Sequence, residues 1–223
     1  MSTSHIVVET PVSFSHPGIE QEVVSSIHDV ISLLPDPATL SLNQCRLVIA
    51  RYAAVLEGNF IYWMTGAYLS ARTDAARSIV ADNLLEEVRD AHPHMLRKFL
   101  IAADAFPTEA DAMSIYTDLT AFRLFIGRLE AGPILAAMAF FEGFIQKFMG
   151  FLAEVARRRG SSEMEYTDVH GVCDVAHTAG LFRALHEELA FATTLSRQDL
   201  FEGVTLLRNL MLLVLAPALA SEN

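Results

Sequence analysis

The chain has 223 residues, a formal net charge of −11 at pH 7, 52% hydrophobic residues and 19% charged residues. A chain of this length can bury a full core as one domain without a disulfide or a structural metal. The negative charge opposes binding to nucleic acid phosphates. Apolar stretches such as 211–220 fall short of the roughly eighteen residues that a membrane span needs. We therefore expect a soluble protein that binds neither nucleic acid nor a membrane.

Residues 1–17 have no basic segment leading into an apolar segment, so they do not resemble a secretory signal. We expect an extended N-terminal arm there. The two cysteines, Cys45 and Cys173, are far apart in the sequence and provide no disulfide framework. This usage fits a reducing compartment and predicts a cytoplasmic protein.

From residue 18 onward, apolar residues recur at spacings of three and four, which indicates an all-α, single-domain bundle over residues 18–223. Pro and Gly residues and N-cap residues such as Thr108 mark the breaks between helices. Seven helices are predicted, at 18–34, 41–71, 73–104, 108–128, 131–159, 164–191 and 196–218. Helical bundles commonly build metal sites in their cores, so the polar residues of these helices are of interest.

In the helix predicted at 73–104, Glu87 and His94 are seven residues apart, which is about two turns, and so they share a face. Both are residue types that bind first-row metals. Pro93 could break the helix at Ala91 or redirect His94. The pair is therefore a candidate half of a metal site.

Three neighbouring residues are assigned lesser roles. Glu86 points about 80° away from His94 and is expected to face solvent, and His92 does not align with Glu87. Asp90, one turn before His94, is an alternative ligand.

Glu142 is the only charged residue between Glu130 and Lys147, in an aromatic and apolar helix. An unpaired buried carboxylate is costly, so Glu142 must be exposed, protonated, paired or bound to a metal. Metal binding is the most specific of these four options.

The segment 170–177 places His170, Asp174 and His177 on one helix face, because each residue advances about 100° around the axis. Two imidazoles and a carboxylate could bind a first-row metal. A solvated polar face is the other interpretation. With Glu87, His94 and Glu142, these residues make three carboxylates and three imidazoles, a set that suits two iron or manganese ions better than one zinc ion.

These motifs, over roughly residues 40–215, resemble the haem-oxygenase-like di-metal oxidases and oxygenases in order and spacing. The resemblance implies a seven-helix fold, with two Fe(II) ions held by the six residues named above. It also implies O₂ as co-substrate and a small substrate, often an amino acid or a fatty acid. Known outcomes are N-oxygenation, oxidative C–C cleavage and self-modifying p-aminobenzoate synthesis. The self-modifying relatives have a tyrosine and a lysine where this chain has Phe141 and Leu152, although Tyr166 matches.

The resemblance also implies that the helix carrying residues 170–177 is mobile and that the second metal is labile. Gly171 and Gly180 lower helix propensity there, consistent with this expectation. Some N-oxygenating relatives use an extra carboxylate, for which Glu57 is a candidate by position. A surface glutamate is the other interpretation of Glu57.

We therefore predict a di-iron oxidase or oxygenase that acts on a small amino-acid-derived substrate in biosynthesis. Three arginines near the ligand helices are candidates for binding a substrate carboxylate: Arg89, Arg97 and Arg183. The alternative is a metal-free or thiamin-salvage-like helical binding protein, for which Cys173 is the only candidate nucleophile in its segment and is interpreted as a packing residue. The high hydrophobic fraction is compatible with a homodimer.

Overall fold

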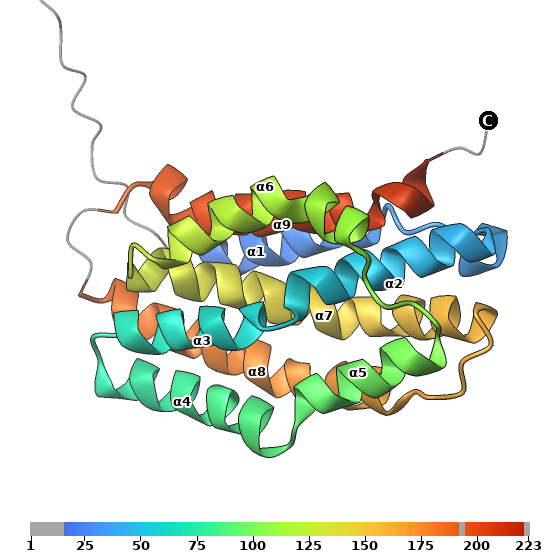
Figure 1. Ribbon diagram of the computed structural model, residues 1–223. Coiled ribbons are helices and arrows are strands. Elements are labelled where there is room, and N and C mark those ends of the chain that lie inside the picture. The colour runs from blue at the N-terminus through green and yellow to red at the C-terminus, as the bar shows by residue number, and fades with distance from the viewer. Residues whose placement is uncertain (1–15, 192–194, 221–223) are drawn as a thin grey trace, which may run out of the picture.

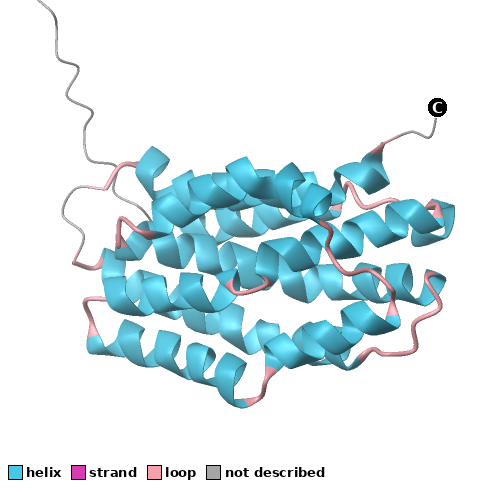
Figure 2. Ribbon diagram, viewed as in Figure 1, coloured by secondary structure: helices cyan, strands magenta, loops and turns pink. Residues whose placement is uncertain are grey.

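A computed structural model describes residues 16–191 and 195–220 of the chain. Within these residues the protein consists of helices and loops, with no strand (Figures 1 and 2). The α-helices are α1 (His16–Ile31), α2 (Leu42–Leu56), α3 (Asn59–Ser70), α4 (Asp74–Arg89), α5 (His92–Ala102), α6 (Glu109–Ile126), α7 (Ala131–Arg158), α8 (Glu165–Leu189) and α9 (Arg197–Leu219). A short 3-10 helix, η1 (Pro37–Thr39), joins α1 to α2. The predicted all-α class is confirmed.

The prediction of seven helices is wrong in count, because two of the predicted helices break. The one predicted at 41–71 is interrupted at Gly58, whose φ is 74°, and becomes α2 and α3. The one predicted at 73–104 is interrupted at Ala91, whose φ is 57°, and becomes α4 and α5. A residue in the left-handed region cannot continue a right-handed helix. Of the predicted arm at 1–17, residues 1–15 lie outside the described residues, while His16 and Pro17 belong to α1.

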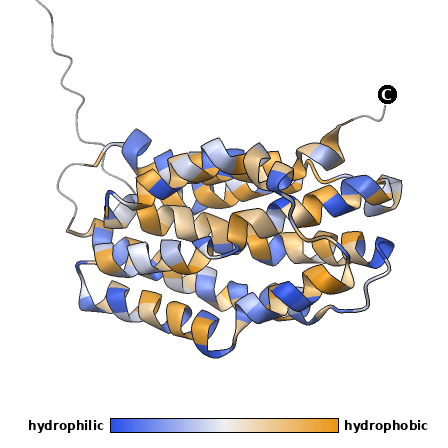
Figure 3. Cartoon of the chain, viewed as in Figure 1, coloured by the Kyte–Doolittle hydropathy of each residue, from blue (hydrophilic) through white to orange (hydrophobic). Residues whose placement is uncertain are grey.

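Helix α7 is the centre of the bundle. It is buried along most of its length and contacts α8, α9, α1, α3 and α2. Its side chains Phe140, Phe144 and Phe148 stack along the helix, and Phe148 also packs on Tyr52 of α2. The helices that surround α7 carry both hydrophilic and hydrophobic residues (Figure 3). The bundle therefore encloses α7 as its hydrophobic axis.

Two helices, α7 and α9, are long and apolar enough to cross a membrane by length and composition. The apolar window of α7 is 83% buried inside the protein, and that of α9 is 56% buried. Burial of this kind is what the core helix of a bundle needs, because an all-round apolar helix is covered on all sides. We interpret α7 as a core helix, and the absence of membrane binding stays a prediction.

Capping side chains hold the helix ends that frame the bundle. At the start of α6, Thr108 and Asp111 form the reciprocal hydrogen bonds of a capping box, as the predicted N-cap requires. The buried Asp111 also receives two hydrogen bonds from Arg46 of α2, at 3.1 and 3.2 Å. This cap therefore joins α6 to α2.

The helices that matter for the site lie together. Helix α8 packs along α7 on one side and contacts α4 and α5 on another (Figure 1). Gly143 permits close packing in this region, because a Cβ there would lie 2.7 Å from Ile27 Cδ1 and 3.4 Å from Thr178 Cγ2. The polar residues predicted on α4, α7 and α8 are thus brought to one part of the core.

Candidate metal centre

The first cluster lies between α7 and α8 and consists of Glu142, Asp174 and His177. One ligand atom of each lies within 4.8 Å of the others, and all three side chains are buried. His177 Nδ1 is 3.7 Å from both Glu142 Oε2 and Asp174 Oδ1. The structure therefore brings together three of the six predicted ligands in one group.

The second cluster joins α4, α5 and α8 and consists of Glu87, His92 and His170, again with ligand atoms within 4.8 Å. His92 Nδ1 is 2.7 Å from Glu87 Oε1, and the rings of His92 and His170 meet edge to face with centroids 4.6 Å apart. His170 Nδ1 is also 3.2 Å from Asp174 Oδ1 of the first cluster. The two clusters are thus adjacent and are linked through α8.

His94, predicted as a ligand, is exposed and lies outside both clusters, and the buried His92 takes the place expected for it. The seven-residue spacing to Glu87 has meaning only along a continuous helix, and the left-handed Ala91 breaks that helix. The predicted alternative ligand Asp90 is also exposed and is paired with Arg89 at 2.8 Å. The signal that pointed to this correction was Pro93, which marks the first turn of α5.

Four buried polar atoms of these clusters have no hydrogen-bond partner among the described residues: Glu142 Oε1, His170 Nε2, Asp174 Oδ2 and His177 Nδ1. Unsatisfied buried polar atoms are rare in folded proteins and call for an explanation. Each of these atoms carries a lone pair in the protonation state that binds metals. Metal ions bound to carboxylate oxygens and imidazole nitrogens would satisfy all four, and this donor set suits iron or manganese.

The side chains of the first cluster influence one another's pKa values. Burial and the nearby Asp174 carboxylate raise the pKa of Glu142 to about 8. Burial alone would lower the pKa of His177, but the nearby carboxylates of Asp174 and Glu142, each 3.7 Å from its Nδ1, raise it to about 11. Burial would raise the pKa of Asp174, yet the hydrogen bond with His170 and the nearby His177 imidazole keep it below its usual value. At neutral pH the metal-free cluster therefore holds protons on Glu142 and His177.

Glu86, expected to face solvent, is instead about one-third exposed, and its Oε2 is 3.1 Å from His177 Nε2. A histidine ligand commonly donates its second ring N–H to a carboxylate, which orients the ring for the metal. Glu86 is placed to do this while the Nδ1 of His177 faces Glu142 and Asp174. The helix-face rule missed Glu86 because α8 approaches α4 from the side on which Glu86 lies.

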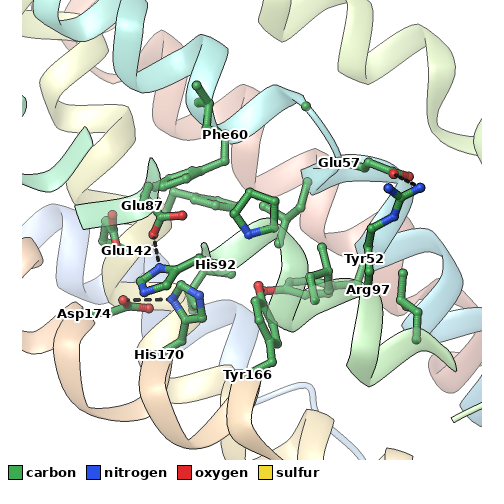
Figure 4. A pocket seen from close by; sticks show the side chains of 18 residues that line it. Tyr52, Glu57, Phe60, Glu87, His92, Arg97, Glu142, Tyr166, His170 and Asp174 are labelled. Carbon is green, nitrogen blue, oxygen red and sulfur yellow. Dashed lines mark hydrogen bonds and ion pairs between the residues drawn. The ribbon is translucent and has the colours of Figure 1, made fainter. Parts of the chain in front are cut away.

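Both clusters open onto a cavity of about 140 Å³. Figure 4 shows Glu87, His92, His170, Asp174 and Glu142 at one end of it. Tyr52 and Tyr166 also line it, with their hydroxyl oxygens 2.8 Å apart, and the ring of Tyr166 lies 4.6 Å from that of His170. Burial raises the pKa of both tyrosines well above the usual value, so both phenols are protonated at neutral pH.

Two other candidates from the sequence are Glu57, as an extra metal ligand, and Cys173, as a nucleophile. Glu57 lies near Arg97, with Oε1 and a guanidinium nitrogen 3.7 Å apart, and belongs to none of the clustered ligand groups found in the described residues. Cys173 is close to His170 and Asp174 and donates its S–H to Asp174 Oδ1 at 3.1 Å. Burial and the Asp174 charge raise the pKa of the Cys173 thiol, so it stays protonated and is a poor nucleophile.

Residues 47–210 match the model of a protein family described as iron-containing redox enzymes, within the haem-oxygenase-like superfamily. This match covers most of the chain, and the chain belongs to that family. Searches of curated proteins and of solved structures gave no significant match.

Proposed function

We propose that this member of the iron-containing redox enzymes is an O₂-dependent di-iron oxidase or oxygenase that acts on a small, amino-acid-derived substrate. The observation that carries the proposal is the set of four buried, unpartnered ligand atoms in two adjacent clusters. Glu142, Asp174 and His177 would hold one iron ion. The other would be held by Glu87, His92 and His170.

When bound, two neighbouring ferrous ions supply O₂ with electrons in pairs. The surrounding side chains hold the ligands in place and let a bound substrate exclude water. The apolar residues Phe60, Phe141 and Ile145 line the cavity beside the clusters, so a bound substrate displaces water from them. Glu86 would orient His177, and the hydrogen-bonded phenols of Tyr52 and Tyr166 stay neutral.

Two metals explain the arrangement better than one. Each cluster has three protein ligands, which come from α7 and α8 in the first cluster and from α4, α5 and α8 in the second. The contact of His170 with Asp174 joins the two clusters. A single ion would leave buried polar atoms of the other cluster without a partner. Manganese is an alternative to iron, because the same oxygen and imidazole donors bind both.

The test is an anaerobic titration of the metal-free protein with Fe(II), followed by mixing with O₂ in the presence of a panel of amino acids and fatty acids. We expect about two Fe(II) per chain and O₂ consumption that one class of substrate accelerates. Absence of Fe(II) uptake under all conditions would support the metal-free binding protein instead. Substitution of Glu142 by Gln is a matched variant, since it keeps the volume of the side chain but removes a charged ligand.

The remaining proposals concern the setting of this chemistry. We propose a reducing, cytoplasmic location, which the two free cysteines, Cys45 and Cys173, support. A small-molecule substrate is supported by the size of the cavity and by its mainly apolar walls.

A further inference from the structure

The cavity has two polar ends. The metal clusters form one, and Glu57 and Arg97 lie at the other (Figure 4). The cavity is also lined by the apolar side chains of Leu56, Phe60, Ile61, Leu96, Phe141 and Ile145 and by the phenols of Tyr52 and Tyr166. A molecule that fills the cavity therefore meets the clusters at one end and an ion pair at the other.

The helix breaks place this ion pair. Glu57 is the C-cap of α2, and the left-handed Gly58 turns the chain directly after it, with φ 74°. Arg97 lies on α5, one turn after Pro93 and beside Leu96, and all three line the cavity. Helix α5 thus carries His92 to the metal clusters and Arg97 to the opposite end.

The Glu57–Arg97 pair is loosely held. Its closest nitrogen and oxygen atoms are 3.7 Å apart, and the two side chains are 52% and 63% exposed. By contrast, Arg46 makes two hydrogen bonds to the buried Asp111. An exposed pair of this kind stabilises a protein little. Charged groups of a substrate can therefore replace the partner of each side chain at low cost.

Arg97 is the only one of the three predicted arginines that lines this cavity. Arg89 pairs with Asp90 on the surface at 2.8 Å. Arg183 is exposed and does not line the cavity. Arg97 is thus the guanidinium that a substrate carboxylate would reach.

We propose that Arg97 and Glu57 bind the carboxylate and the ammonium group of an α-amino acid, so that its side chain extends along the apolar wall to the metal clusters. This inference rests on the proposed function, because it concerns the orientation of the substrate in that site. A guanidinium binds a carboxylate through two parallel hydrogen bonds, and a carboxylate accepts from an ammonium group. The substrate atoms nearest to the clusters then belong to the side chain and not to the α-carboxylate.

The test uses the full chain loaded with Mn(II), in which amino-acid binding is measured by calorimetry without oxidation. The probes are the twenty standard L-amino acids and L-norleucine. The tightest binder is then compared with its amide, which lacks the carboxylate, and with its des-amino acid, which lacks the ammonium group. We expect each of these two losses to weaken binding to the unchanged protein by about tenfold.

The variants assign each charge. Arg97→Gln should weaken binding of the amino acid about tenfold but leave binding of its amide unchanged. Glu57→Gln should likewise weaken binding of the amino acid about tenfold but leave binding of the des-amino acid unchanged. Arg89→Gln is the control and should bind like the unchanged protein. Mn(II) uptake is measured for every variant, so a failure of the metal site is seen separately. No binding of any probe by the Mn(II)-loaded protein, or equal losses in Arg97→Gln and Arg89→Gln, would overturn the proposal.

Discussion

A comparison of His92→Ala with His94→Ala tests which of the two histidines binds metal. The structure places His92 beside Glu87, whereas the seven-residue spacing predicts His94. The imidazole of His92 is buried, and its Nδ1 lies 2.7 Å from Glu87 Oε1. Truncation of His92 leaves the buried Glu87 carboxylate without that hydrogen bond, which should destabilise the metal-free protein by about 1 to 3 kcal/mol. It also removes one of the three ligands of the cluster with Glu87 and His170.

The effect on metal affinity should be larger still. Changes to groups that only orient a ligand reduce metal affinity by about 10- to 100-fold. Loss of a ligand itself should therefore lower the metal affinity of the cluster of Glu87, His92 and His170 by more than about 100-fold. His94 is exposed, and a surface substitution changes stability by about 0.5 kcal/mol or less, so His94→Ala should change metal affinity by no more than about twofold.

The assay is a titration with Mn(II) in which the free ion is counted by electron paramagnetic resonance, with urea unfolding of the metal-free variants alongside. We expect His92→Ala to lose one tight Mn(II) equivalent and His94→Ala to keep both. If His94→Ala loses metal and His92→Ala does not, then α4 and α5 form one continuous helix around residue 91. The helix break at Ala91 between α4 and α5 would in that case be wrong.

Three further predictions address the charges and the backbone of the site. In the metal-free protein the folded-state pKa values of Glu142 and His177, about 8 and about 11, lie above their ordinary values of 4.5 and 6.5. The stability from these protons is complete below pH 4.5 and 6.5 respectively and is lost as pH rises through 8 and 11. The melting temperature of the metal-free protein should therefore fall from pH 6.5 to 9. Mn(II) affinity should rise over the same range, because the ligands release their protons. A melting temperature and an Mn(II) affinity that change in the same direction would contradict this. Glu86→Gln should weaken Mn(II) binding at the α7–α8 cluster by about 10- to 100-fold, against no change in a Glu165→Gln control. Ala91→Gly should raise stability in urea unfolding by about 1 kcal/mol because φ is 57°, whereas Ala81→Gly inside α4 should lower it by about 1 kcal/mol; losses in both variants would argue against a left-handed Ala91.

The all-α class could be predicted because apolar periodicity continues through almost every helix. The two breaks could not be placed in the same way. Gly58 and Ala91 adopt left-handed conformations in segments whose apolar periodicity continues without interruption across these residues. Ala91 in particular gives no sequence signal, since alanine favours helix more than other residues do. Only Pro93, two residues later, indicated that the helix predicted at 73–104 could end there.

The same distinction explains which site residues could be found. His170, Asp174 and His177 lie on α8, which is continuous, so their spacing of three and four placed them on one face, as the structure has them. Glu142 was identifiable because a lone carboxylate in an apolar helix needs a partner, and the structure buries it among these groups. The contact of Glu86 with His177 depends on how α8 packs against α4, and no periodicity within one helix predicts that packing.

The two clusters therefore differ in what holds them. The cluster of Glu142, Asp174 and His177 is built from two long helices packed side by side, and its geometry follows from their contact. The other cluster takes His170 from α8 but needs the left-handed corner at Ala91 to bring His92 to Glu87. Strained backbone persists only where its surroundings hold it, and the buried hydrogen bond between His92 and Glu87 is one such restraint. A metal bound to both side chains would add another, so occupancy of this cluster and order at the α4–α5 corner should increase together.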